Sequence, residues 1–443
     1  MDSALGTTPA TVTGRTWRKV GTRIIPLIGV AYVMSYVDRA NLGYVAAPMS
    51  RDLHLDSGQV GLAAGLFFIG YIIVEVPSNL ALRRFGARKW ITRIMLTWGL
   101  VTGLTATVDS AAALYIARLA LGFAEAGLAA GILLYLTYWF PRRQRSWALT
   151  GFFLMIPVSS IVGSPLAAAL LTWGQNLFGI AGWRSLFLVE GVVTILIGIL
   201  IFVFLPDRPA DARWLDDAEK STVERTLAAE AEEQRGHGAL TGLRQALTSG
   251  RVWALAVAFF AVVFGLYPLA FFLPTMITTI THSIGGAADV GSVLLSGIPY
   301  LVAALAMLAW VRVAGRRTAV FATGVPMAVG AAGLLLATFA GNGPVFILAV
   351  CLSVAGIYTA MPQFWRIPAI GLTGTAAASG IALINSVSNL SGFVGPYFTG
   401  AIKTATGSFT YALLAIAVIM VAGLVVLVTV GRRVERLDGK LTS

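Results

Sequence analysis

Twelve stretches of the chain are long and apolar, and polar segments separate them. Each has about 20 residues or more, the length that an α-helix needs to cross the hydrocarbon core of a bilayer. Glycine and proline inside these stretches are tolerated, because neighbouring helices can satisfy the backbone groups that they free. The pattern predicts an all-α membrane protein with twelve transmembrane helices, at approximately residues 24–46, 58–80, 90–108, 112–139, 146–172, 184–205, 252–280, 289–311, 318–339, 344–368, 375–401 and 409–430.

Composition supports this class. Hydrophobic residues make up 57% of the 443 residues and charged residues only 12%, a balance that excludes an ordinary soluble domain. The polar N-terminal segment lacks the apolar core and cleavage site of a signal peptide, so we expect the first span to remain in the mature protein. The single cysteine, Cys351, allows no intrachain disulfide, and we expect it to be a packed core thiol.

The expected membrane topology explains the net charge of +12, and no polyanionic partner is needed to account for it. Most Lys and Arg residues fall at the two chain ends and in the loops after the second, fourth, sixth and eighth spans, whereas Arg51, Arg184 and Lys403 fall in or beside the other loops. The positive-inside rule then predicts cytoplasmic termini for a multi-pass protein of the inner (plasma) membrane, and no nucleic-acid partner is expected.

The longest polar segment divides the spans into six and six. We expect an N-terminal six-helix bundle at residues 1–205, a cytoplasmic central loop at 206–250 and a C-terminal six-helix bundle at 251–443. The loop mixes acidic and basic residues, which favours a solvated linker with a surface helix over a regulatory site. Two such bundles suit a transporter whose halves rock around a site at the middle of the membrane.

Ionisable residues inside the spans are the strongest functional signal. Asp38 and Arg39 are adjacent in the first span, where each charge costs about 2.5–3.5 kcal/mol unless it faces water or a partner. In the fourth span, Arg118 and Glu125 are seven residues apart and share nearly one helix face, and Gly122 between them is expected to leave room for water or a ligand. The functional interpretation is an anion-binding arginine beside a protonatable carboxylate. The alternative is a buried pair that only fixes helix packing.

Polar and aromatic residues in other spans are further candidates. Tyr71 lies at mid-depth in the second span, and Asn385 and Asn389 share one face of the eleventh, where they could contact substrate or join helices. Glu75 is expected to act as a gate or packing residue, and Glu190 is open to the same interpretations. The aromatic candidates for a pocket wall are Tyr267, Phe271, Phe272, Tyr300 and Trp365.

Motifs for catalysis, metal binding and ATP binding are missing from the sequence. It contains no HExxH, GxSxG or Walker-type sequence, and His54, His237 and His282 are scattered over loops. We therefore expect neither enzymatic activity nor a metal or other cofactor.

Six sequence motifs are similar to those of one transporter family. They are YVDRANL at 36–42, EVPSN at 75–79 with the basic turn that follows, RLALGFAEAG at 118–127, LPDRPADARW at 205–214, SGIALIN at 379–385 and GFVGP at 392–396. Over nearly its whole length the chain resembles the major facilitator superfamily, and within it the anion:cation symporter family, in the branch of tartrate, phthalate and 4-hydroxyphenylacetate permeases.

The resemblance implies proton-coupled import of a small organic anion by alternating access, with a carboxylate, hydroxy-acid or aromatic-acid substrate. It implies that Asp38 and Glu125 carry protons, that Arg39 is the main carboxylate contact, and that Arg118 couples the substrate to Glu125. The implied partners are the carboxylate, protons and the lipid bilayer, and we expect a monomer. The further substrate-binding candidates are Tyr36, Tyr71, Asn385, Asn389 and Trp365. The gating candidates are Glu75, Arg84 and Arg88.

Two positions depart from the family pattern. The loop from Arg312 to Arg317 lacks the usual acidic residue, which predicts a weaker or different latch in the second half. Arg366 stands where the branch has a small or apolar residue, and it either extends to the membrane interface or alters the substrate pathway.

Two other functional classes stay open. A proton-coupled exporter of drug-like or metabolite compounds is disfavoured because the fifth span has Pro157, Gly163 and Pro165 but not the fuller Gly/Pro cluster of antiporters. A membrane sensor that binds an acid without moving it is less favoured still, since no signalling domain is attached.

Overall fold

The computed structural model describes residues 9–233, 239–280, 286–315, 317–340, 343–371 and 374–441, and every regular element among them is helical. The first half contains α1 (Pro9–Leu53), α2 (Ser57–Phe85), α3 (Ala87–Thr105), α4 (Ala111–Glu125), α5 (Leu128–Thr137), α6 (Arg142–Phe178) and α7 (Gly182–Phe204). The central segment contains the 3-10 helix η1 (Pro209–Asp211), α8 (Asp217–Glu233) and α9 (Ala239–Thr248). The second half contains α10 (Gly250–Ile280), α11 (Gly286–Leu295), α12 (Gly297–Ala314), α13 (Ala319–Thr338), α14 (Gly343–Phe364), α15 (Arg366–Gly371), α16 (Gly374–Thr406) and α17 (Thr410–Leu441).

These helices confirm the predicted twelve-span fold. Ten stretches of the described residues are long and apolar enough to cross a membrane. The other two predicted spans are α3, whose first turns contain Arg88, Lys89 and Arg93, and α16, which is rich in glycine, serine and threonine. Three predicted spans consist of two consecutive helices each, namely α4–α5, α11–α12 and α14–α15.

The break between α4 and α5 occurs at Gly127, whose φ of 90° lies in the left-handed region that favours glycine. A Cβ at this position would also overlap the Ser78 side chain of α2. The helix α4 therefore ends at Glu125, and α2 packs closely beside this end.

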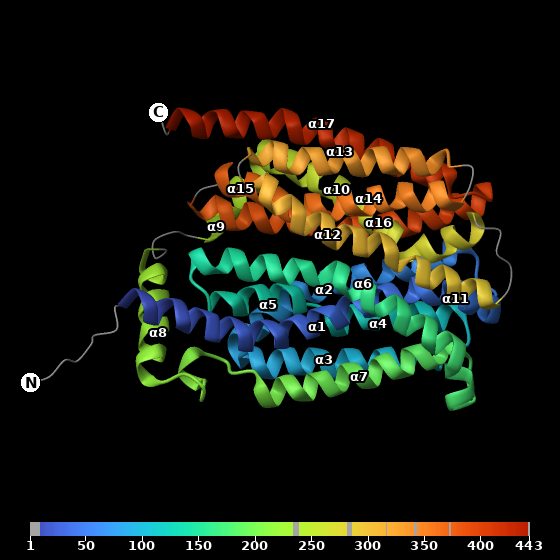
Figure 1. The fold of residues 1–443 in the computed structure, drawn as a ribbon, viewed down its shortest axis with the longest axis horizontal. Helices are drawn as coiled ribbons and strands as arrows, with labels where there is room; N and C mark the ends of the chain where they lie inside the picture. Colours follow the sequence, from blue (N-terminus) through green and yellow to red (C-terminus); the bar gives the residue numbers. More distant parts are fainter. Residues whose placement is uncertain are drawn as a thin grey trace, which may run out of the picture.

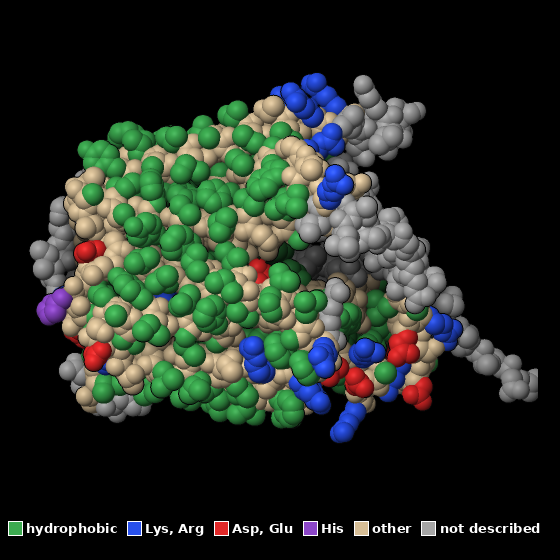
Figure 2. Space-filling view, turned by 180° about the vertical axis from the view of Figure 1, so that it is seen from behind, with side chains coloured by type: hydrophobic (Ala, Val, Ile, Leu, Met, Phe, Trp, Pro, Cys, Tyr) green, Lys and Arg blue, Asp and Glu red, His purple; other side chains and the backbone are tan. Residues whose placement is uncertain are grey.

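The helices of each half lie together, and the two halves lie side by side (Figure 1). The chain enters α1 and leaves α17 at the same end of the molecule, where α8 and α9 also lie (Figure 1). Lys and Arg side chains gather at this end, and apolar side chains cover the flanks of both halves (Figure 2). We call it the basic end, and the other the opposite end.

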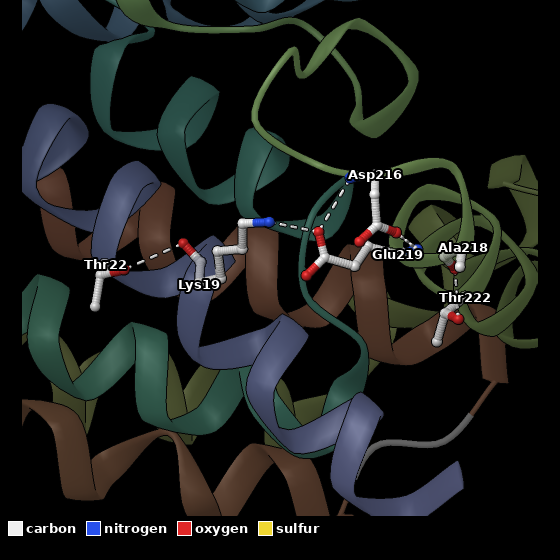
Figure 3. Close-up of polar contacts among 6 residues, drawn as sticks. All are labelled: Lys19, Thr22, Asp216, Ala218, Glu219 and Thr222. Atoms are coloured by element: carbon white, nitrogen blue, oxygen red, sulfur yellow. Dashed lines mark hydrogen bonds and ion pairs between the residues drawn. The ribbon is translucent and has the colours of Figure 1, made fainter. Parts of the chain in front are cut away.

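The central segment forms helices that attach to different halves. Lys19 of α1 donates a hydrogen bond of 2.6 Å to Glu219 of α8 (Figure 3). Glu219 also accepts a hydrogen bond from the Asp216 backbone, and Asp216 accepts one from the Glu219 backbone, so the two carboxylates cap the start of α8. The helix α9 packs against α16 of the second half.

The halves are in close contact toward the opposite end. A Cβ on Gly61 or Gly65 of α2 would overlap Pro396 or Phe393 of α16, so these helices are in backbone contact. Val76 follows Gly65 by eleven residues, which is about three helical turns and returns to nearly the same face. Its side chain is 67% exposed. The helix α2 therefore separates from α16 toward the basic end, where the surface between the halves is hollowed (Figure 2).

Candidate functional site

Among the side chains that the structure describes, five charged ones are buried between the membrane helices of the first half. They come from three helices and form what we call the buried charge cluster: Asp38, Arg39, Arg118, Glu125 and Glu190. Each is at most 8% exposed. Charges this deeply buried require partners, so the contacts among these residues define the candidate site.

Arg39 and Glu125 form the ion pair of the cluster. Arg39 donates two hydrogen bonds, of 2.9 Å from Nε and 2.7 Å from Nη2, and both go to Oε1 of Glu125. Ser35 Oγ donates a third to the same oxygen, at 2.6 Å. The other oxygen, Oε2, is buried without a hydrogen-bond partner among the described residues. One carboxylate oxygen thus accepts hydrogen bonds from both Nε and Nη2 of Arg39.

Aromatic rings surround the other faces of the Arg39 guanidinium. Its central carbon lies 5.1 Å from the ring centres of Tyr36 and Tyr71 and 5.2 Å from that of Phe67. These distances are within the range of cation–π contacts. The structure therefore brings two predicted pocket residues, Tyr36 and Tyr71, to the predicted carboxylate contact.

Asp38 points to a different set of partners, as expected for the neighbour of Arg39 on a helix. Thr102 Oγ1 donates a hydrogen bond of 2.8 Å to its Oδ1, and Asn41 Nδ2 donates one of 3.2 Å. The same Asn41 nitrogen donates to Glu190 Oε2 at 2.7 Å. One amide therefore bridges two buried carboxyl groups, and Glu190, for which the sequence left the role open, belongs to the cluster.

Arg118 is buried in the cluster without a hydrogen bond to Asp38 or Glu125. Its charge interacts with those of Asp38 and Glu125, yet all three guanidinium nitrogens are buried with no hydrogen-bond partner among the described residues. The predicted space beside Gly122 is wrong: a Cβ there would overlap the Phe67 carbonyl, so this glycine permits the crossing of α4 with α2 instead of leaving room for a ligand.

A small cavity of about 20 Å³ lies where the two halves meet beside Arg39. That volume is near the minimum that holds one water molecule. Its lining includes helices of both halves: Tyr36, Arg39, Ala40, Ser160, Leu266, Tyr267, Ala270, Phe271 and Tyr358. Tyr267 and Phe271 were expected in a pocket wall. Ser160 and Tyr358 were not, since a lone hydroxyl inside an apolar span gives little signal in the sequence.

The predicted pocket residues Tyr71, Arg118, Phe272 and Tyr300 do not line this cavity, although Tyr71 contacts Arg39. Three further predicted pocket residues also lie outside the lining. Trp365 packs at the basic end of α14, with its ring 4.9 Å from that of Phe259. Asn385 and Asn389 are half-buried on α16. The structure brings none of the three to the cavity next to Arg39.

The predicted gating residues lie toward the basic end. Glu75 is half-buried on α2 and interacts electrostatically with Arg39. Arg84 is exposed, with its guanidinium over the Phe85 ring. The Arg88 backbone donates a hydrogen bond of 2.8 Å to Asp207, which fixes the start of α3.

Arg366 lies outside the cavity lining and contacts the end of α12. Its guanidinium donates hydrogen bonds to the backbone oxygens of Ala314, at 2.9 Å, and Arg317, at 3.0 Å. A basic side chain at these carbonyls caps the end of α12. The residue therefore holds the loop that lacks the family's acidic residue.

Comparison with known proteins decides the family. Residues 28–396 match the family model of the Major Facilitator Superfamily. The chain belongs to this superfamily. It is thus a transporter and not an enzyme, and a multi-pass protein of the cell membrane.

Relatives and a solved structure agree with this assignment. The chain is 41% identical over 402 residues to a putative tartrate transporter of Agrobacterium vitis, covering 89% of this chain and 87% of the relative. It is 36% identical over 424 residues to a quinolone resistance transporter of Acinetobacter baumannii, covering 95% of each. The fold resembles the inward-facing, unoccupied crystal structure of a bacterial homologue of the human lysosomal transporter Spinster, with a TM-score of 0.70 at 17% identity, covering 98% of this chain and 99% of that one. The tartrate transporter is consistent with the predicted anion:cation symporter-like branch.

Proposed function

We propose that this transporter is a proton-coupled symporter that imports a small organic carboxylate, with its basic end in the cytoplasm. The observation that carries the proposal is that Arg39 lines the cavity between the halves while Glu125 occupies its fork. A guanidinium fork also matches a substrate carboxylate in bidentate geometry. Substrate and Glu125 therefore compete for the same donors.

A proton decides this competition. Protonation of Glu125 removes the negative charge that binds Arg39, so the guanidinium becomes free for the substrate. Loss of the proton restores the ion pair and expels the carboxylate. Asp38 and Arg118 act beside this pair, since the charge of Arg118 interacts with both acidic residues. In this scheme the closed contact of α2 with α16 and the hollow at the basic end correspond to the inward-facing state after release.

Transport in proteoliposomes tests the proposal. Labelled L-tartrate is offered from outside to vesicles with an alkaline lumen, and we expect uphill accumulation that a protonophore abolishes. Each pH unit supplies about 1.4 kcal/mol per proton, or roughly tenfold accumulation. Protein-free vesicles provide the control. Tartrate that only equilibrates, or that does not enter, would contradict the proposal.

Export of an aromatic compound is the second candidate, because a relative is named for quinolone resistance and three tyrosine rings line the cavity. The same vesicles distinguish the two directions. An antiporter would concentrate a fluorescent quinolone in vesicles with an acidic lumen, whereas the symporter concentrates tartrate in vesicles with an alkaline one.

A further inference from the structure

The polar groups that line the cavity are of two kinds. Arg39 is the one charged residue of the described lining, and the others with polar side chains are hydroxyl residues: Tyr36, Ser160, Tyr267 and Tyr358. The remaining lining is apolar. A substrate carboxylate bound to Arg39 would leave the rest of the substrate among hydroxyl groups and apolar surface.

Ring packing holds the two tyrosines of the second half in place. The Tyr267 ring of α10 lies edge-on to Phe68 at 4.4 Å, and the Tyr358 ring of α14 lies edge-on to Tyr300 at 5.6 Å. Both residues are buried, at 6% and 5% exposed. Since neighbours fix the rings, the positions of the hydroxyl groups are fixed before a substrate arrives, which lowers the cost of ordering them on binding.

The hydroxyl groups converge on the region beside Arg39. Tyr267 interacts electrostatically with both Arg39 and Tyr36. Tyr358 interacts with Tyr36 and Tyr267. The two tyrosines of the second half therefore approach the arginine and the tyrosine of the first half across the cavity, from helices that are distant in sequence.

We propose that Ser160, Tyr267 and Tyr358 form a hydroxyl subsite that selects hydroxylated carboxylates over acids of the same skeleton without hydroxyl groups. This inference rests on the proposed function, because it needs a carboxylate at Arg39. A hydroxyl group both donates and accepts, so each member of the subsite can pair with a substrate hydroxyl. An acid that lacks hydroxyl groups cannot form these hydrogen bonds, and a site built to hydrogen-bond a substrate hydroxyl discriminates against the analogue that lacks it.

L-Tartrate and succinate test the subsite, because they differ only by two hydroxyl groups on one dicarboxylate skeleton. The half-saturating concentration of each acid is measured in proteoliposomes for wild type, Tyr267→Phe and Tyr358→Phe. Each substitution removes one hydroxyl and keeps the ring. We expect about two- to tenfold weaker tartrate binding, the usual effect of one hydrogen bond, and unchanged succinate binding. Unchanged succinate transport also shows that the variants are folded.

Tyr411→Phe is the matched control, since Tyr411 is 60% exposed on α17, and neither acid should respond to it. Equal losses for tartrate and succinate in the cavity variants, or no loss for tartrate, would overturn the hydroxyl subsite alone. Failure of wild type to accumulate either acid would reject the proposed function and the subsite with it.

Discussion

The two halves of the molecule differ in where they place charge. The first half buries all five members of the buried charge cluster, while no charged residue is buried in the described part of the second half. The second half contributes tyrosines and apolar residues to the cavity. In a rocking transporter, the Arg39–Glu125 pair then stays within one half, so opening the cavity can leave this pair intact. Proton binding and substrate release can therefore use a contact whose geometry the motion leaves intact.

At their basic ends the halves are alike. In the first half, Asp207 accepts a hydrogen bond of 2.8 Å from the backbone of Arg88 at the start of α3. In the second, Glu435 accepts one of 2.8 Å from the backbone of Val320 at the start of α13. In both cases a carboxylate after or within the last helix caps the third span of the same half. The two halves thus share this capping hydrogen bond, while they contribute different chemical groups to the site.

The largest expected effect comes from removing charge in the first half. Glu125→Gln and Asp38→Asn should abolish accumulation driven by a pH gradient, because the proton-carrying groups are lost. Exchange of labelled for unlabelled tartrate should continue, since it needs no net proton movement. Asp109→Asn changes an exposed carboxylate and serves as the control. Normal accumulation by both cluster variants would contradict the proposal that the first half carries the protons.

A smaller effect is expected from Gly61→Ala, which should shift the equilibrium between the state closed at the opposite end and the state closed at the basic end. Gly61→Ala places a methyl group against Pro396 of α16, and overpacking of this kind costs about 1–3 kcal/mol. We expect the opposite end to open and the basic end to close, with slower maleimide labelling of a cysteine introduced at Val76. Gly103→Ala is the matched control, because a Cβ there meets no atom within 4 Å. Equal labelling in the two alanine variants would contradict the closed contact.

Arg39→Lys tests how much the paired hydrogen bonds of the guanidinium contribute to substrate binding. Lysine keeps the charge but cannot make two parallel hydrogen bonds. Loss of one hydrogen bond to a charged group corresponds to about 1.5–3 kcal/mol, so tartrate should bind roughly tenfold or more weakly. The half-saturating concentration for uptake provides the measurement. An unchanged value would exclude Arg39 as the carboxylate contact.

Much of this arrangement could be predicted from the sequence. The twelve apolar stretches fixed the fold class, because membrane-spanning helices need little beyond length and hydrophobicity. The residues Asp38, Arg39, Arg118 and Glu125 were identifiable because charge inside an apolar span is costly. Their partners were not. The pairing of Arg39 with Glu125 depends on how α1 packs against α4, and one sequence carries no signal of that contact.

The errors have a common physical cause. Gly122 was interpreted as space, but a glycine on a helix face equally permits a neighbouring backbone to approach, and α2 does so. The sequence also carried no signal for the contacts of Trp365 with Phe259 and of Arg366 with the end of α12. Tyr358 was missed for the opposite reason, since a tyrosine among apolar residues resembles ordinary packing.

Replacing the carboxyl of Glu190 by an amide should preserve transport, whereas the same replacement at Asp38 should abolish accumulation. The buried charge cluster has three carboxyl groups and two arginines, so full ionisation would leave one uncompensated negative charge in a medium of low polarity. Arg39 pairs with Glu125, and the charge of Arg118 interacts with Asp38 and Glu125, whereas no arginine interaction is found for Glu190 among the described residues. We therefore expect Glu190 to be the carboxyl that stays neutral. Glu190→Gln should then transport within about twofold of wild type. Glu190→Leu removes one of the two acceptors of Asn41 and should lower stability by about 1–3 kcal/mol. Loss of coupling in Glu190→Gln would instead make it a third proton carrier.

The smallest effect is expected where the central segment attaches to the first half. The Lys19 and Glu219 side chains are 33% and 10% exposed, so water screens their ion pair (Figure 3), and Lys19→Ala should destabilise the protein by at most about 1 kcal/mol. Glu219→Ala should cost more, because Glu219 also accepts the hydrogen bond that caps α8. Thermal unfolding in detergent at low and high salt measures both, and only the Lys19 contribution should vanish at high salt. Transport should stay unchanged in Lys19→Ala, because α8 is fastened to the half that already holds the charge cluster. A transport defect in this variant would show that α8 takes part in the rocking of one half against the other.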